Sequence, residues 1–305
     1  MRRTANYLSL VVLTAVLFCG LAAAETGGLR YTITVSSFEN QSSWHGQWDL
    51  GHAWGTVMTD VLNDTGHFIV LGETDMRNEA LAEQDFAASG RTAQGSKAPT
   101  TGQMTPAQLL VKGAITHVQY QTKGTGGGVR VKGFKVGGKK ESAEINATIY
   151  LVDSTTGQVM ASTDVVGESN RKGGSVGYSS YDWGANLSGF KNDNVGKAME
   201  FAISDATEWL IAQLPEVPWT GTVALVKDGQ IYVNRGTREG VAAGQEFVVG
   251  TAEVIRDPDT GEILDEALTE VARLQANTVK EKLSICSVTS GNAAAVTRGM
   301  TVYLP

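Results

Sequence analysis

The fold is decided by residues 111–190, which read VKGAITHVQYQTKGTGGGVRVKGFKVGGKKESAEINATIYLVDSTTGQVMASTDVVGESNRKGGSVGYSSYDWGANLSGF. Alternating apolar and polar residues lead to two glycine- and lysine-rich stretches, at 137–140 and 170–174, with no helical periodicity between them. This pattern predicts two long β-hairpins, over residues 116–152 and 158–190, with their tips at those stretches. Because projecting hairpins expose strand edges, we expect them to pair with other strands, such as the same hairpins of neighbouring subunits.

The side chains of the hairpins bear on whether they enter a membrane. A membrane-spanning β-strand needs roughly 9–11 residues with an apolar outward face. The second hairpin meets this condition better than the first, whose arms carry Arg130, Lys132 and Lys135. The candidate membrane-facing side chains are Tyr181, Trp183, Ala185 and Leu187 in the second hairpin and Val129 and Val131 in the first.

Residues 1–24 have the composition of a signal peptide. Arg2 and Arg3 precede an apolar run from Leu8 to Leu21, and three alanines stand before Glu25. This run is too short for a membrane-spanning helix, so it predicts an exported protein of the outer membrane or periplasm. We favour cleavage after Ala24 over lipidation at Cys19, because Phe18 is larger than the residues that lipoprotein processing prefers.

Charge and cysteine content exclude some classes of protein. The formal charge is −7, and without Arg2 and Arg3 it becomes −9. An acidic exported chain without basic clusters is a poor candidate for nucleic-acid binding. After cleavage Cys286 has no cysteine partner, and its apolar surroundings predict a buried strand residue rather than a nucleophile or a ligand.

The chain is long enough for two domains, with the boundary at the proline-containing segment 215–218. We predict an α+β domain over 25–214, in which an α/β body carries the two hairpins. We predict a small all-β domain, a barrel or a sandwich, over 219–305.

Within the first domain, residues 29–37 alternate as a half-buried strand, and two amphipathic stripes predict core helices. One stripe runs from Trp54 to Leu62 and the other from Val195 to Leu210. A helix capped by Thr74 or Asp75 is expected through Leu81, and a short helix is expected after Thr105-Pro106.

A glycine-rich loop, residues 41–52, separates the first strand from the first helix and contains Trp44, Gln47 and Trp48. Its two tryptophans must either pack under the loop or face a ligand or partner, and the sequence leaves both alternatives open. His45 and His52 have no third ligand near them, so a metal site is not expected there.

Motifs for catalysis and for cofactors are missing. The run Gly124–Arg130 lacks the Gly-Lys-Ser/Thr of a phosphate loop and opens a strand rather than a helix. The turns 153–158 and 257–262 are too short for calcium loops and instead predict hairpin turns with glycine at positive φ. We therefore expect no cofactor, no metal and no catalytic residues.

The order of elements resembles the CsgG family, the outer-membrane secretion channels of curli amyloid subunits. The resemblance covers residues 29–214 and rests on Ile33-Thr-Val-Ser-Ser-Phe-Glu-Asn40, Val57-Met-Thr-Asp-Val-Leu62, His67-Phe-Ile-Val-Leu71, Leu109-Leu-Val-Lys-Gly-Ala-Ile115, the turn at 153–158 and the closing helix. The tail, residues 219–305, is similar to the C-terminal domain of the flagellar assembly protein FlgT.

The resemblance implies a ring of identical subunits whose hairpins form one shared β-barrel in the outer membrane. It implies that the loop 41–52 narrows the pore, with Trp44, Gln47 and Trp48 as the constriction candidates. Our first hypothesis is therefore a non-enzymatic, homo-oligomeric secretion or assembly component that handles a secreted polymer subunit. The alternative is a soluble periplasmic scaffold of an envelope or flagellar machine, and a third hypothesis is an envelope enzyme that depends on His45 or His52.

Overall fold

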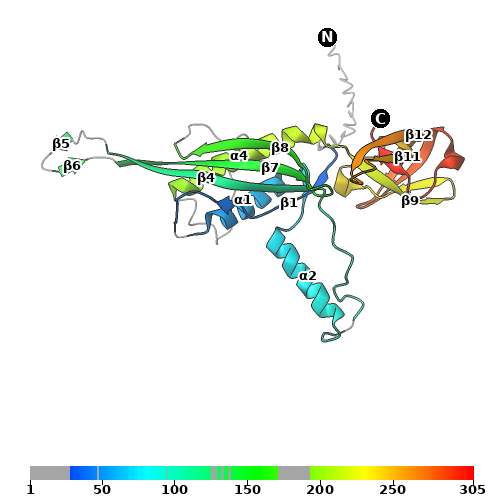
Figure 1. Cartoon of the computed structure of the whole chain (residues 1–305), viewed down its shortest axis with the longest axis horizontal. Helices are drawn as coiled ribbons and strands as arrows, with labels where there is room; N and C mark the ends of the chain where they lie inside the picture. Colours follow the sequence, from blue (N-terminus) through cyan, green and yellow to red (C-terminus); the bar gives the residue numbers. More distant parts are fainter. Residues whose placement is uncertain are drawn as a thin grey trace, which may run out of the picture.

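The computed structural model describes residues 28–46, 48–93, 95–124, 129–131, 134–136, 139–170 and 193–305. These residues form a body built on one mixed β-sheet, followed by a closed β-barrel (Figure 1). The α+β class and the small all-β part at the C-terminal side are confirmed.

The sheet of the body has the strand order β3-β1-β4-β7-β8, with β2 beside β4. Strand β1 is parallel to β3 and β4, whereas β7 is antiparallel to β4 and β8. The strands are β1 (Tyr31–Val35), β2 (Glu39–Asn40), β3 (Phe68–Val70), β4 (Leu109–Gly124), β7 (Lys139–Asp153) and β8 (Val159–Glu168).

Strands β4 and β7 form the longest pair of the sheet, with 16 and 15 residues. Leu109 lies opposite Asp153 at one end of the pair, and Gly124 lies opposite Lys139 at the other. Figure 1 shows the pair extending past the helices toward the short strands β5 and β6. The predicted first hairpin, 116–152, falls within this pair.

The predicted tip at 137–140 is wrong. Lys139 and Lys140 belong to β7, where they pair with Gly124 and Lys123. Beyond them, β5 (Val129–Val131) pairs with β6 (Phe134–Val136). The glycines had suggested the turn, but strand pairing continues on both sides of them. In the second predicted hairpin β8 supplies the first arm, and residues 171–190 lie outside the described part of the chain.

Two helices, α1 (Leu50–Thr65) and α4 (Asn194–Gln213), cover one face of the sheet. Asp49 caps α1, because its carboxylate accepts a hydrogen bond from the backbone N–H of His52 at 3.0 Å. Both predicted stripes are confirmed as core, since all but one of their apolar residues are buried: Trp54, Val57, Met58, Val61, Leu62, Val195, Ala198, Met199, Ala202, Ile203, Ala206 and Leu210. The exception, Trp209 of the second stripe, is partly buried and packs against the core.

Helix α2 (Thr74–Ala88) projects away from the sheet (Figure 1). The prediction that Thr74 or Asp75 caps it is wrong, because the cap position is Glu73, whose side chain makes no capping bond. Met76 and Leu81, which carried the helical pattern, are about half exposed. The periodicity thus predicted a helix correctly without predicting a buried one.

The short helix predicted after Thr105-Pro106 is also wrong. Residues 105–108 run without regular structure into β4. Gln108 explains this path, because its side-chain oxygen accepts the backbone N–H of Thr32 at 3.1 Å and its own N–H donates to the Thr32 hydroxyl at 2.9 Å. These contacts with β1 replace the bonds that a helical turn would make.

The barrel has the strand order β10-β13-β12-β11-β14-β9 and closes on itself. Cys286 lies buried in β13, as predicted, and Trp219 stacks on Phe247 with ring centroids 5.4 Å apart. The strands are β9 (Thr220–Lys227), β10 (Gln230–Val233), β11 (Glu246–Arg256), β12 (Ile263–Val279), β13 (Ser284–Gly291) and β14 (Thr301–Tyr303).

Two hairpin turns follow the predicted chemistry. The Asp153 carboxylate accepts backbone hydrogen bonds from residues 155 and 156, and Gly157 has φ of 74°. Asp257 accepts in the same way from residues 259 and 260, and Gly261 has φ of 76°. In each turn the aspartate fixes the local path and the glycine takes the left-handed conformation.

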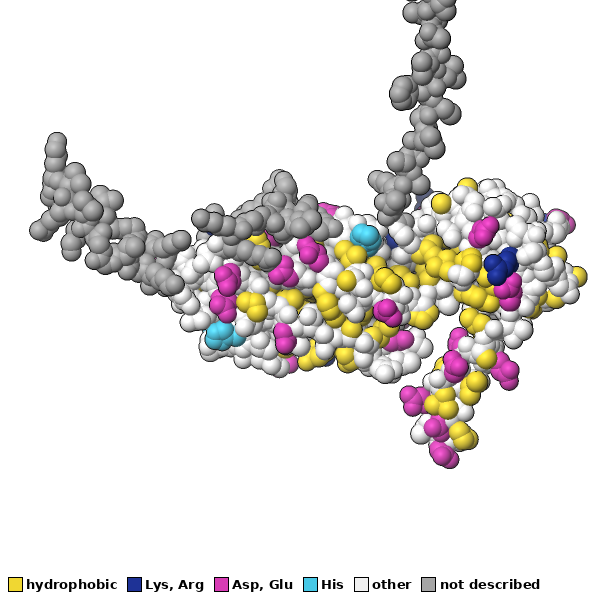
Figure 2. All heavy atoms as spheres, turned by 90° about the horizontal axis from the view of Figure 1, so that it is seen from above, with side chains coloured by type: hydrophobic (Ala, Val, Ile, Leu, Met, Phe, Trp, Pro, Cys, Tyr) yellow, Lys and Arg dark blue, Asp and Glu magenta, His cyan; other side chains and the backbone are white. Residues whose placement is uncertain are grey.

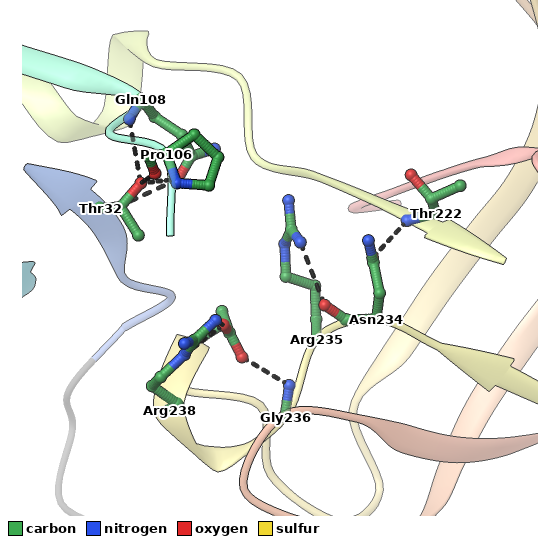
Figure 3. A network of polar contacts seen from close by, with 9 residues as sticks. Thr32, Pro106, Gln108, Thr222, Asn234, Arg235, Gly236 and Arg238 are labelled. Atoms are coloured by element: carbon green, nitrogen blue, oxygen red, sulfur yellow. Dashed lines mark hydrogen bonds and ion pairs between the residues drawn. The ribbon is translucent and has the colours of Figure 1, made fainter. Parts of the chain in front are cut away.

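Hydrogen bonds from the start of β1 join the body to the linker and to the barrel. The Tyr31 hydroxyl donates to the Val217 carbonyl at 2.7 Å, and the Arg30 backbone N–H donates to the Glu239 carbonyl at 2.9 Å. In the close-up of this junction (Figure 3), Arg235 and Arg238 come from the barrel side and Thr32 from β1. The chain before β1 is therefore fastened to the barrel as well as to the sheet.

Close contact between α4 and β8 depends on Gly167. A Cβ atom at this position would lie 1.8 Å from the carbonyl oxygen of Ala198, which is backbone and cannot rotate away. We predict that Gly167→Ala lowers the free energy of unfolding by about 1–3 kcal/mol, as overpacking does. Urea denaturation followed by circular dichroism measures this loss.

The matched control is Gly95→Ala, since a Cβ there meets no atom within 4 Å. Its effect should stay within about 0.5 kcal/mol. Equal midpoints for the two variants would contradict the packing that we describe for α4.

Candidate functional site

The loop between β2 and α1 is fastened at both ends. At its start, the Gln41 backbone N–H donates to the Ile115 carbonyl of β4 at 2.9 Å. The Asn40 side chain then organises the turn, because its nitrogen donates to the Trp44 carbonyl and its oxygen accepts from the N–H and the hydroxyl of Ser42. At its end Asp49 caps α1. The loop therefore has a defined conformation and is anchored beside the middle of β4.

Trp44 and Trp48 are brought together in this loop. Their ring centroids are 4.7 Å apart and the rings are tilted by 56°. Both side chains are half-buried and pack against the main core, and each retains an exposed part. Gly46 lets the turn form, since a Cβ there would lie 1.9 Å from the Trp44 ring. Each ring therefore packs against the core, as the first of the two alternatives has it, and keeps an exposed part. That the exposed part faces a ligand or partner stays a prediction.

The structure describes only some of the other predicted site residues. Gln47, the third constriction candidate, lies outside the described residues. So do Tyr181, Trp183, Ala185 and Leu187 of the second hairpin. Val129 and Val131 lie on β5, opposite Val136 and Phe134. The membrane-facing role of these residues stays a prediction.

A second candidate site, which the sequence did not suggest, lies where β1 and β3 end. Ser37, His52, Glu73, Thr74, Asp75 and Asn78 line a cavity of about 220 Å³. The carboxyl ends of parallel strands are a common position for ligand sites in α/β folds. The only signal in the sequence was an acidic residue between a short strand and a helix, which is too common to single out.

Glu73 is the unusual residue of this cavity, because only 2% of it is exposed. Burial raises the pKa of its carboxyl, and the nearby charge of Asp75 raises it further. The hydroxyls of Thr56 and Thr59 and the charge of His52 act in the opposite direction. One carboxyl oxygen, Oε1, has no hydrogen-bond partner.

A serine, a histidine and a glutamate line this cavity, and these are residue types of a hydrolytic triad. A triad requires a hydrogen bond between nucleophile and base and another between base and acid. No such bond joins Ser37, His52 and Glu73 in the described structure, which shows a cavity but not the geometry of that chemistry. His45 lies in the loop near Trp44 and takes no part in the cavity.

The described residues hold neither a metal-binding cluster nor a helix suited to crossing a membrane. No three histidine, cysteine, aspartate or glutamate side chains in this part of the chain gather closely enough to hold an ion. None of the described helices combines the length and the apolar character that crossing a bilayer requires.

The fold and the anchored loop define a class of protein, an α/β body with a long strand pair, a glycine-rich loop before its first helix and an added barrel. The chain matches the family described as "Curli production assembly/transport component CsgG" over residues 18–245. The protein belongs to the CsgG family. The match extends beyond the predicted residues 29–214 into the first part of the barrel.

Solved structures with a similar fold come from several bacteria. The PelC dodecamer from Paraburkholderia phytofirmans has 15% sequence identity and a TM-score of 0.30, and covers 58% of this chain and 85% of its own. The hypothetical protein CT253 from Chlamydia trachomatis has 14% identity and a TM-score of 0.32, and covers 61% and 95%. The C-terminal domain of LpoB from Escherichia coli has 14% identity and a TM-score of 0.25, and covers 45% and 82%.

No curated protein gives a significant match to this sequence. The similarity of residues 219–305 to the flagellar protein FlgT finds no support in these comparisons and stays a prediction.

The hydrogen bonds of Asn40 should control the order of the loop. We predict that Asn40→Ala accelerates amide exchange in residues 41–46, because three hydrogen bonds of about 0.5–1.5 kcal/mol each are removed from a short exposed turn. Hydrogen–deuterium exchange measures the effect. Asn277→Ala, at an exposed position of β12 in the barrel, is the control and should leave the loop unchanged.

The raised pKa of Glu73 gives a prediction with a definite sign. A carboxyl whose folded-state pKa is raised stabilises the fold below its unfolded pKa, about 4.3, and loses that contribution as the pH rises through the folded value. Glu73→Gln keeps the shape and cannot ionise. We predict that the variant melts at a higher temperature than wild type at pH 7.5 and that the difference vanishes at pH 4.

The control for this measurement is Glu79→Gln, which removes a carboxylate from the exposed surface of α2, outside the cavity. A melting difference for Glu73→Gln that stays constant from pH 4 to 7.5 would contradict the assignment.

Proposed function

We propose that the protein is a non-enzymatic, homo-oligomeric secretion or assembly component of the outer membrane. In this proposal identical subunits form a ring and pass or organise the subunit of an extracellular polymer. Membership of a family described by curli production, assembly and transport supports this class of function. Partners would be further copies of the chain, the secreted subunit and accessory envelope proteins.

The length of the first hairpin carries the proposal. Among the described side chains of β4 and β7, the last buried one toward the hairpin is Ala143, which lies opposite Tyr120. The sequence holds 22 residues between Tyr120 and Ala143, enough for two arms of about 10 residues with a short turn. A strand that crosses a bilayer needs roughly 9–11 residues.

A hairpin of this length requires partners. In a bilayer every backbone N–H and C=O must be paired, and an open strand edge leaves a row of them unpaired. One hairpin has two such edges, so the hairpins of one chain would close a barrel only together with those of other copies. This requirement links the membrane location to a ring of identical subunits.

The loop 41–49 is the proposed constriction of the channel. Large side chains that line the narrowest part of a pore limit its conductance. The paired rings of Trp44 and Trp48 are bulky, are supported by the core and reach the surface. The loop is anchored to the sheet, which would hold the rings at a fixed distance from the channel axis.

Single-channel recording tests this proposal. Detergent-purified protein in planar bilayers should conduct ions, and the double variant Trp44→Ala, Trp48→Ala should raise the conductance because both rings are removed. Trp209→Ala is the control, since this partly buried tryptophan lies on α4 and away from the loop. It should leave the conductance unchanged.

A protein that stays in solution without detergent and never conducts would contradict the proposal. That result would favour a periplasmic scaffold, in which the same body presents the barrel to a partner.

A further inference from the structure

Strands β11 and β12 continue past the barrel as a two-stranded finger, residues 251–271. Strand β11 pairs with β14 only as far as Gly250, and β12 pairs with β13 only from Ala272 onward. Between these positions the two strands pair only with each other, from Thr251 opposite Thr269 to Arg256 opposite Ile263. At the base of the finger the Val271 carbonyl accepts the backbone N–H of Asn292 at 3.0 Å. Beyond this bond neither outer edge of the finger pairs with another described strand, so both edges can form backbone hydrogen bonds.

The finger exposes apolar side chains to solvent. Five of them are between 39% and 58% exposed: Val254, Ile255, Ile263, Leu264 and Leu268. Figure 2 shows the finger projecting from the barrel with hydrophobic and acidic side chains side by side. Three of the five lie on β12, so the outer edge of this strand combines free backbone groups with apolar surface.

The finger is also strongly acidic. Six carboxylates lie between residues 253 and 266, namely Glu253, Asp257, Asp259, Glu262, Asp265 and Glu266, against the single cation Arg256. The Arg256 guanidinium donates to the Gly261 carbonyl at 3.0 Å, within the turn. At the base, Glu270 is paired with Arg273 at 2.9 Å. No ion pair to the six carboxylates occurs in the described residues, so their charge is available to a partner.

We propose that the outer edge of β12, residues 263–271, binds a basic, extended segment of another protein as an added strand. Free edges accept strands through backbone hydrogen bonds, and alternate side chains supply the specificity. Successive side chains of a strand point to opposite faces, so Leu268 and Asp265 lie on different faces of β12. An added strand with alternating residues would place its apolar side chains beside Leu268 and its lysines or arginines beside Asp265. The inference does not depend on a channel.

The negative charge of the finger disfavours three other binding partners: a second copy of the finger, an anionic lipid surface and a nucleic acid. Pairing with the finger of a second copy would bring two acidic edges together, and like charges opposite each other destabilise a sheet. Anionic lipid surfaces and nucleic acids are repelled by the same carboxylates. Acidic side chains on an edge prevent association between identical strands, while leaving association with a basic strand favourable.

A pair of synthetic peptides tests the proposal on the full mature chain. The probe is Lys-Val-Lys-Val-Lys-Val-Lys, and the control is Lys-Pro-Lys-Pro-Lys-Pro-Lys, which has the same charge and cannot add as a strand. Fluorescence anisotropy should show binding of the valine peptide and much weaker binding of the proline peptide. Hydrogen–deuterium exchange should show protection of residues 263–271 only with the valine peptide.

Variants locate the binding edge. Asp265→Asn with Glu266→Gln should weaken the valine peptide about fivefold, as expected when a basic peptide loses two exposed carboxylates next to the edge that it binds. The control Asp228→Asn with Glu281→Gln removes the same charge from exposed positions outside the finger and should not change the affinity. Equal weakening by both pairs, equal binding of both peptides, or protection elsewhere in the chain would overturn the proposal.

Discussion

The pairing of β4 with β7 is the constraint on which the body depends. It fixes the position of β1 and β2, which pair with β4, and of β8, which pairs with β7. Helix α4 packs on β7 and β8, where Gly167 permits contact with the helix backbone. The loop with Trp44 and Trp48 is fastened to β4 through Ile115. A single strand pair therefore sets both the core of the body and the position of the candidate constriction.

The same strand pair extends past the core, and the proposed function rests on this extension. Strands that serve only the core end where the buried side chains end, as β1 and β3 do after five and three residues. Strands β4 and β7 continue past Ala143, the last buried side chain among their described ones, which lies opposite the half-exposed Tyr120. The cost of exposing such a hairpin is offset only if its edges are paired, which is the physical basis for proposing a ring.

Sequence periodicity predicted the parts of the fold that depend on burial. The stripes from Trp54 and from Val195 were correct because helices on a sheet must present a continuous apolar face. The aspartate–glycine turns at 153–158 and 257–262 were correct because their chemistry is local. The errors arose where distant contacts decide the structure: Gln108 binds Thr32 and prevents a helix, and cross-strand pairing carries Lys139 and Lys140 into β7.

The candidate sites also divide into one that the sequence indicated and others that only the structure shows. The sequence pointed to Trp44 and Trp48 because aromatic residues in a glycine-rich loop are unusual. It gave no indication of the Glu73 cavity, which forms only when the ends of β1 and β3 meet the first turn of α1. The sequence did not indicate the finger at 251–271 either, since its strands have the same residue pattern as those of the barrel. Only their pairing shows where the barrel ends.

Electron microscopy of the protein purified in detergent tests the central claim most directly. Our account predicts closed rings of identical subunits with a transmembrane barrel built from the hairpins that extend β4 and β7. Single chains that remain dispersed without detergent would contradict it.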